Sequence, residues 1–92
     1  AAYALQANYP NPFNPTTTLS FSLDQAQEVE LNVFDMKGNH VKSLYSGYAG
    51  AGQHAIRFDA YDASGMELTA GIYFYTLRSN RGISTQRMTL LK

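Results

Sequence analysis

Apolar and polar residues alternate along much of this chain. Leu19, Phe21 and Leu23 stand at every second position of residues 16–23, and valine and leucine repeat in the same way through residues 27–35. A repeat of two is typical of a β-strand with one face against a core. The pattern therefore predicts strands at 16–23 and 27–35, with these apolar side chains turned inward.

Turn-forming residues divide the rest of the chain into further short segments of the same kind. Residues 46–52 hold three of the seven glycines, and we interpret them as a loop. The run at 72–77 is apolar on both faces, which favours a central strand. In all, the pattern predicts further strands at 41–45, 53–59, 66–69, 72–77 and 83–91.

These segments favour one architecture. Seven short strands, turns at intervals of about ten residues and no amphipathic helical repeat predict an all-β, immunoglobulin-like β-sandwich of about seven antiparallel strands. Such sandwiches often hold a tyrosine near the start of a late strand, with its hydroxyl bonded to upstream backbone. We expect Tyr73 to fill that role.

The first fifteen residues form a separate lead-in to the sandwich of residues 16–92. All three prolines lie between positions 10 and 15. Proline fixes φ and lacks a backbone N–H, so this segment is predicted to be an ordered loop or a sheet edge rather than a helix. Tyr9 and Phe13 are the rings available to anchor it on a core.

Composition and charge exclude several classes of function. The net charge is zero and no cysteine is present, which argues against nucleic acid as a partner and excludes disulfides and thiolate metal sites. The charge is unevenly spread, because residues 1–36 carry four acids and no base, whereas residues 68–92 carry four bases and no acid. No apolar run reaches the roughly 20 residues of a membrane-spanning helix. The abrupt start without methionine leads us to expect a piece of a longer protein, with any export peptide upstream.

Catalytic and metal-binding patterns are weak. His40 and His54 lack ligand spacing, and Glu28 and Glu30 are expected to point to solvent, so neither an enzyme activity nor a cofactor is predicted. The loop 59–65 contains Asp59, Asp62 and Ser64 before a glycine. We interpret it as an Asx-turn, with calcium binding as the alternative.

Several motifs together resemble one known family. They are Leu5–Thr17 with its proline-asparagine run, Val33–Gly38, Asp59–Gly65, Gly71–Tyr75 and the closing Arg87–Lys92. This set resembles the C-terminal sorting domain, Por secretion type A, of proteins exported by the type IX secretion system of some Gram-negative bacteria. Two positions depart from the family pattern: Arg87 stands where lysine is common, and Tyr61 where several relatives have glycine or a basic residue. The middle of the chain is also similar to the immunoglobulin-like domain of the flagellar hook-capping protein.

The resemblance to sorting domains implies a non-enzymatic address label at the end of a larger cargo protein. The implied partners are the covalently linked upstream cargo, the outer-membrane type IX translocon and a sortase-like processing protease. The implied destination, reached through the periplasm, is the cell surface or the extracellular space. The residues that carry the resemblance are the lead motif Asn8, Pro10, Asn11, Pro12, Phe13, Asn14 and Pro15, and the sorting-signal candidates Gly71, Tyr73, Arg87, Met88, Leu90, Leu91 and Lys92.

A physical reading of the last strand agrees with this implication. A signal read after the cargo has folded must be accessible, and a final strand rich in charge and hydroxyl groups offers an edge for pairing with another strand. We therefore expect residues 71–92 to be recognised as a folded hairpin.

Two other classes of function remain open from the sequence. Tyr45, Tyr48 and Tyr61 are predicted to lie in or beside loops, where tyrosines can stack on sugar rings. A carbohydrate-binding module, with polysaccharide as its partner, is the main alternative. A passive spacer or adhesive immunoglobulin-like module is the other.

Overall fold

A computed structural model describes residues 3–91 of the chain. Over this range the chain forms strands joined by turns and loops, with no helix. The seven strands are β1 Tyr3–Leu5, β2 Thr16–Leu23, β3 Gln27–Asp35, β4 His40–Ala49, β5 Gly52–Asp59, β6 Gly71–Ser79 and β7 Gly82–Leu90. None of residues 3–91 belongs to a helix that could cross a membrane.

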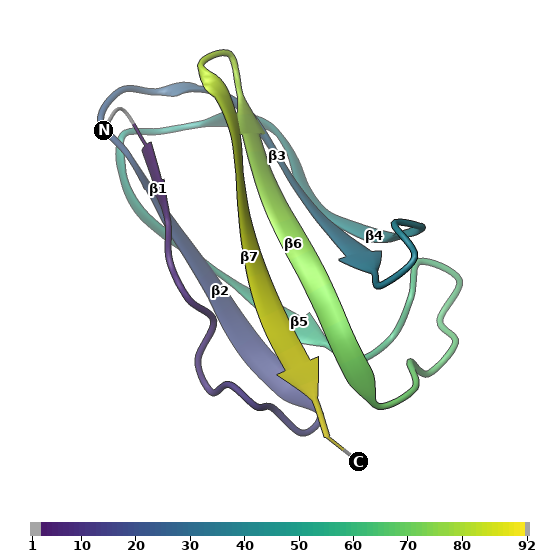
Figure 1. Cartoon of the computed structure of the whole chain (residues 1–92). Coiled ribbons are helices and arrows are strands. Elements are labelled where there is room, and N and C mark those ends of the chain that lie inside the picture. Colours follow the sequence, from purple (N-terminus) through teal and green to yellow (C-terminus); the bar gives the residue numbers. More distant parts are fainter. Residues whose placement is uncertain (1–2, 92) are drawn as a thin grey trace.

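The strands form two facing sheets (Figure 1). One has the order β1-β2-β5 and the other β4-β3-β6-β7, and every strand pair is antiparallel. Side chains at alternate positions of both sheets meet between them, as the two-residue repeat predicts; Leu19, Phe21 and Leu31 are fully buried there. The prediction of an immunoglobulin-like β-sandwich is confirmed.

Two local predictions are wrong. Residues 46–52 are not a loop throughout, because β4 continues to Ala49, with Gly47 paired to Val29 in β3, and β5 begins at Gly52. Only residues 50–51 lie between the two strands. Glycine is disfavoured in strands, but pairing with a neighbouring strand overrides that preference. Residues 66–69 are not a strand: Glu67 forms a single isolated bridge with Tyr61, and the segment is not part of the strand order of either sheet.

The predicted order of the last two strands is correct. β6 lies between β3 and β7, so it is a central strand, and β7 is an edge strand. The Tyr73 hydroxyl donates a hydrogen bond to the Thr69 backbone carbonyl over 2.7 Å, the contact expected of it. The edge that β7 exposes is where the lead-in meets the end of the chain.

Candidate functional site at the terminal strand

The lead-in pairs with the outer edge of β7 at Phe13. The Phe13 N–H donates to the Thr89 carbonyl, and the Leu91 N–H donates to the Phe13 carbonyl, each over 2.9 Å. Phe13 and Leu90 thereby form a parallel bridge. In Figure 1 the purple segment that follows β1 runs down the molecule and reaches the carboxyl end of β7. Two of the motifs that carry the family resemblance, the lead motif and the terminal motif, therefore lie side by side.

Asn11 adds side-chain contacts to the same edge. Its Oδ1 atom accepts a hydrogen bond from the Thr89 N–H over 3.1 Å, and its Nδ2 atom donates to the Arg87 carbonyl over 3.5 Å. The backbone groups of β7 that point away from β6 are thus occupied between Arg87 and Leu91. The terminal strand is an edge strand, as expected, but the carboxyl half of its edge is already covered.

Asn8 ties the lead-in to β2, ahead of the part that contacts β7. Its Nδ2 atom donates to the Pro10 carbonyl over 3.1 Å and to the Thr17 hydroxyl over 3.0 Å, and that hydroxyl donates to Pro10 in turn. Tyr9 and Thr18 exchange two backbone hydrogen bonds of 3.0 Å. The buried amide of Asn8 thus ties the proline turn to β2.

Only one of the two candidate rings anchors the lead-in. Phe13 is 1% exposed and packs against Phe58, with ring centroids 6.1 Å apart, whereas Tyr9 is 82% exposed. The lead prolines Pro10, Pro12 and Pro15 and the neighbouring Asn14 are also exposed. All three prolines follow cis peptide bonds. Phe13 is therefore the side chain that seats this segment on the core.

Tyr75 makes a further tie that sequence reasoning missed. Its buried hydroxyl donates to the Gln6 carbonyl over 2.7 Å, and burial raises the pKa of this tyrosine to about 12, although a hydrogen bond from the Asn8 backbone opposes the rise. The Gln86 side chain of β7 likewise donates to the Leu5 carbonyl over 3.0 Å. Both bonds depend on the packing of strands distant in sequence, so no local pattern reveals them.

The sorting-signal candidates fall into two groups. Tyr73, Met88 and Leu90 are buried in the core, and Gly71 pairs with Leu90 in the sheet. Arg87 is exposed and Leu91 is 49% exposed. Lys92 lies outside the described residues. A partner that contacts the folded domain can reach Arg87 and Leu91 but not the three buried side chains.

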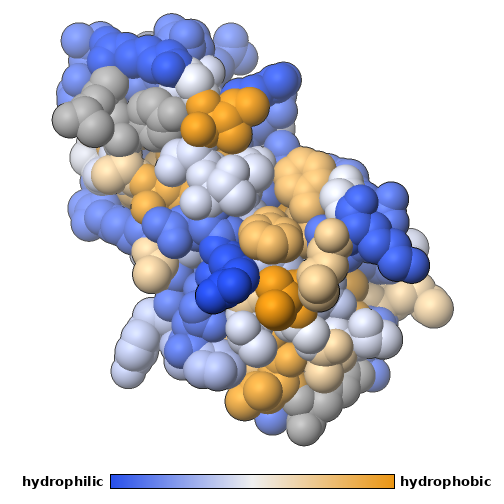
Figure 2. Space-filling view, viewed as in Figure 1, coloured by the Kyte–Doolittle hydropathy of each residue, from blue (hydrophilic) through white to orange (hydrophobic). Residues whose placement is uncertain are grey.

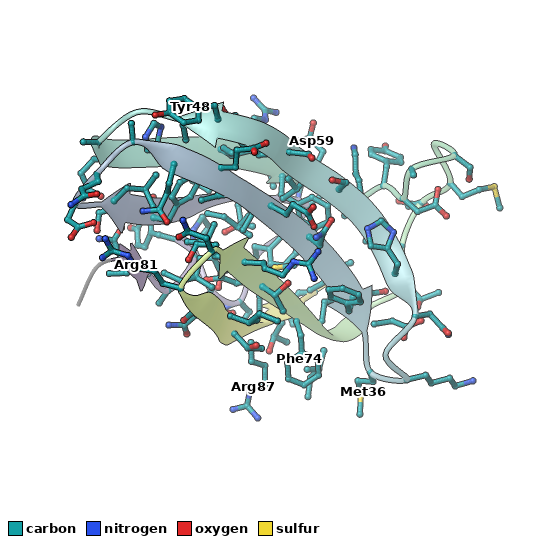
Figure 3. The ribbon with its side chains drawn as sticks, turned by 90° about the horizontal axis from the view of Figure 1, so that it is seen from above. Met36, Tyr48, Asp59, Phe74, Arg81 and Arg87 are labelled. Atoms are coloured by element: carbon teal, nitrogen blue, oxygen red, sulfur yellow. The ribbon has the colours of Figure 1, made fainter. Side chains whose placement is uncertain are left out.

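Arg87 stands at one end of a row of side chains on the outer face of the four-stranded sheet. The register places His40, Phe34, Phe74 and Arg87 side by side on four successive strands. The His40 and Phe34 rings meet edge to face, with centroids 5.5 Å apart. Figure 3 shows Phe74 and Arg87 projecting from the same side of the sheet, with Met36 on that side at the next turn.

This row is the centre of an apolar patch. Met36 is 68% exposed, and Phe34, Ile72 and Phe74 are partly exposed. Figure 2 shows apolar side chains gathered in the middle of this face with strongly hydrophilic ones beside them. Sequence reasoning missed the patch. Apolar residues at the outward positions of 72–77 could have indicated it, but we interpreted them only as evidence for a central strand.

The loop 59–65 forms the predicted Asx-turn. Asp62 Oδ1 accepts hydrogen bonds from the Ser64 hydroxyl, the Ser64 N–H and the Met66 N–H, at 2.7, 2.9 and 2.9 Å. These donors, the Ser64 hydroxyl first, lower the pKa of Asp62. Asp59 is engaged separately by Arg57 and Thr16. Within residues 3–91 no three His, Asp or Glu side chains are grouped so that they could hold a metal ion.

The three tyrosines proposed for sugar stacking do not form one surface. Tyr45 and Tyr48 lie within β4 rather than in a loop. Tyr48 stands at the end of β4 that leads into β5, whereas Tyr61 follows the far end of β5. An eight-residue strand spans roughly 25 Å, so Tyr48 and Tyr61 lie at opposite ends of the sandwich.

Glu28 and Glu30 line a shallow hollow of about 210 Å³ on the outer face of the four-stranded sheet. Glu30 lies 3.6 Å from Arg78, and both side chains are well exposed to solvent. An open hollow with an exposed ion pair lacks the enclosed pair of carboxyl groups that acid-base catalysis of glycoside cleavage needs.

A family model of the FlgD Ig-like domain matches residues 8–82. The chain belongs to the FlgD Ig-like domain family. The match includes residues 8–15 of the lead-in and all of β6 but ends at the first residue of β7. Membership therefore rests on the sandwich and the lead-in, and it leaves the terminal motif of this Ig-like domain untested. No curated protein matches the chain.

Several solved structures share the fold, among them PorU, PorZ and FlgD. PorU from Porphyromonas gingivalis superposes with a TM-score of 0.78 at 18% identity, over 97% of this chain and 9% of PorU. PorZ, described as an essential surface component of the type IX secretion system of that bacterium, gives 0.62 at 18% identity, over 97% of this chain and 12% of PorZ. FlgD from P. aeruginosa gives 0.65 at 21% identity, over 95% of this chain and 73% of FlgD. At these identities the likeness establishes the fold, and this Ig-like domain spans only about a tenth of PorU or PorZ.

Proposed function

We propose that this Ig-like domain is the C-terminal sorting module of a larger exported protein. In this proposal the type IX translocon recognises the folded module and moves its cargo across the outer membrane to the cell surface or the extracellular space. A sortase-like protease then separates module and cargo. The module itself carries out no reaction.

One observation carries the proposal. The lead motif and the terminal motif, which hold most of the resemblance to sorting domains, meet through hydrogen bonds that Phe13 and Asn11 exchange with the backbone of residues 87–91. A domain that served only as a spacer would not need both motifs at one site. PorZ, described as a component of a type IX secretion system, contains a domain with this fold, and so does PorU of the same bacterium.

Within this site, Arg87 and the neighbouring outer face offer the surface for recognition. Arg87 projects into solvent beside Phe74, and Met36 lies farther along the same side of the sheet (Figure 3). The buried residues of the terminal motif, Met88 and Leu90, hold the strand in place. Interfaces are enriched in arginine, aromatic residues and methionine, and this patch has that composition. The spacing of Tyr48 and Tyr61 gives no support to the sugar-binding alternative, so we do not carry it forward.

The test is export of a reporter fused ahead of residues 1–92 in a host with the type IX machinery. Deletion of Arg87–Lys92 would be a poor test, because it removes the buried Met88 and Leu90 and would unfold the module. Arg87→Glu is sharper, with Arg81→Glu as its control. Arg81 lies at the other end of the same hairpin and pairs with Asp24 on the surface. Both changes alter the net charge equally.

We expect Arg87→Glu to reduce the exported reporter at least tenfold and Arg81→Glu to leave export near the original level. Equal loss in both variants would show that the net charge of the hairpin matters rather than the Arg87 site. Export of the reporter without any of residues 1–92 would overturn the proposal itself.

A further inference from the structure

The outer edge of β7 already holds one short strand, and the contacts show what that edge accepts. The Phe13 segment lies parallel to β7, gives its N–H to the Thr89 carbonyl and accepts the Leu91 N–H. This is the backbone pattern of strand addition to a sheet edge. The occupant happens to be part of the same chain.

The binding position, or seat, at this edge of β7 accepts one large side chain between the sheets. Phe13 is fully inserted between the sheets against Phe58, whereas its neighbours Pro12 and Asn14 are exposed. A ligand for this edge therefore needs an extended backbone and one large apolar side chain with a free N–H and C=O at the same residue. The flanking residues are free to vary.

The occupant can leave without disrupting the rest of the lead-in. Its attachment to β7 consists of the two Phe13 backbone bonds and the two Asn11 side-chain contacts, one of them 3.5 Å long. Before it, Tyr9 is held independently by two bonds to Thr18, and β1 by its pairing with β2. The Pro10 carbonyl is held as well, by the Asn8 amide and the Thr17 hydroxyl. Residues 11–15 can thus detach while these anchors stay in place.

We propose that the β7 edge from Arg87 to Leu91 is an exchangeable strand-binding site. Its resident ligand is the Asn11–Phe13 segment, and an extended strand of a partner protein with a large apolar residue can replace that segment. The inference does not depend on export, but in a sorting module it would give the translocon a defined place to pair.

A tethered ligand has a high effective concentration, about millimolar for a short linker, so a free strand competes poorly with it. Weakening the resident ligand should therefore expose the site. Phe13→Ala in the full chain removes the inserted ring and keeps the backbone. Phe34→Ala is the matched control, since it removes the same ring from the outer face of β3, away from the seat.

The probe is a synthetic peptide with the sequence of residues 9–16, and a second peptide with alanine in place of its phenylalanine is the blank. Binding is followed through the backbone amide NMR signals of Thr89 and Leu91. We expect the first peptide to shift both signals in Phe13→Ala. Its apparent affinity for this variant should be at least tenfold higher than its affinity for the unchanged chain or for Phe34→Ala. The blank should not bind.

Equal affinity in all three proteins, or a folded Phe13→Ala protein that ignores the peptide, would overturn the proposal. If Phe13→Ala does not fold, Asn11→Ala removes only two exposed side-chain contacts and serves in its place. Hydrogen exchange at Thr89 and Leu91 should then rise about tenfold and fall again when the peptide is added. Unchanged exchange in Asn11→Ala would equally refute an exchangeable edge.

Discussion

Phe13 donates its backbone N–H to the Thr89 carbonyl over 2.9 Å while its ring lies fully inside the sandwich. One residue of the lead-in thus both pairs with the last strand and fills the core. Replacing a buried phenylalanine with alanine typically costs about 3–5 kcal/mol. We expect Phe13→Ala to lose stability near the lower end of this range, because the lead-in can relax into the space.

Urea denaturation would measure the loss. Phe74→Ala is a suitable comparison, since Phe74 is partly exposed on the outer face and should cost roughly half as much or less. Equal losses in the two variants would mean that Phe13 contributes no more than a surface ring.

Tyr75 should stabilise the domain through its hydroxyl. Tyr75→Phe keeps the ring but leaves the Gln6 carbonyl and the Asn8 N–H without their partner. A buried hydrogen bond of this kind is worth about 1–2 kcal/mol. We expect a loss of that size in urea denaturation, together with faster hydrogen exchange at Asn8. No loss would show that water replaces the hydroxyl without cost.

The same hydroxyl predicts how stability changes at high pH. The pKa of Tyr75 is about 12 in the folded chain, above the ordinary value of 10.0. As the pH rises, the unfolded chain therefore releases this proton before the folded chain does. The contribution of the Tyr75 hydroxyl to the free energy of unfolding is present below pH 10 and is lost as the pH rises toward 12. Each pKa unit corresponds to about 1.4 kcal/mol, so the loss from this group is at most about 3 kcal/mol.

The other tyrosines and the lysines also titrate in this range, so the measurement must be a difference. Stability should fall more steeply between pH 10 and 12 in the unchanged chain than in Tyr75→Phe. Parallel curves for the two proteins would contradict the raised pKa.

Asp62 should act as a turn former and not as a calcium ligand. Asp62→Asn retains the Oδ1 acceptor for the Ser64 and Met66 donors and should change the melting temperature little. Asp62→Ala removes the acceptor and should lower it by a few degrees, in line with about 0.5–2 kcal/mol for a lost cap. Added millimolar calcium should leave all three melting temperatures unchanged, and a calcium-dependent rise in the original protein would refute this assignment.

β2 and β3 were located correctly because their burial follows directly from a two-residue repeat. Leu19, Phe21 and Leu23 belong to such a strand, and they are buried as predicted. β1 carries no repeat over its three residues, and it forms only because β2 supplies a pairing edge. The segment around Gly47 shows the reverse error. Its glycine content suggested a loop, but pairing with β3 keeps it in strand β4.

The candidate site was predictable in its residues but not in its geometry. Phe13 and Arg87 both belong to motifs that the sequence singles out, yet nothing local tells that the first segment closes the edge of the last strand. That contact joins positions 78 apart, such as Asn11 and Thr89, and it depends on which strand the sandwich leaves at the edge. Edge position is a property of the completed sheet order rather than of any one segment.

Gly71 belongs to the resemblance motif, but the structure gives it a backbone role. Its φ of +150° lies in the region that side-chain-bearing residues rarely adopt, and a Cβ added there would meet no atom within 4 Å. Gly71→Ala should therefore be destabilising by about 1 kcal/mol or more through backbone conformation alone. Gly50→Ala is the control, because Gly50 is equally open but lacks a positive φ.

Gly50→Ala should leave stability unchanged or slightly improved, since alanine restricts the unfolded chain. Chemical denaturation of both variants separates the two effects, and export of a fused reporter separates stability from recognition. If Gly71 serves only the fold, export of Gly71→Ala should recover at lower growth temperature as the module refolds. Persistent loss of export in a variant shown to be folded would instead make Gly71 part of the surface that the partner contacts, since it pairs with Leu90 beside the terminal edge.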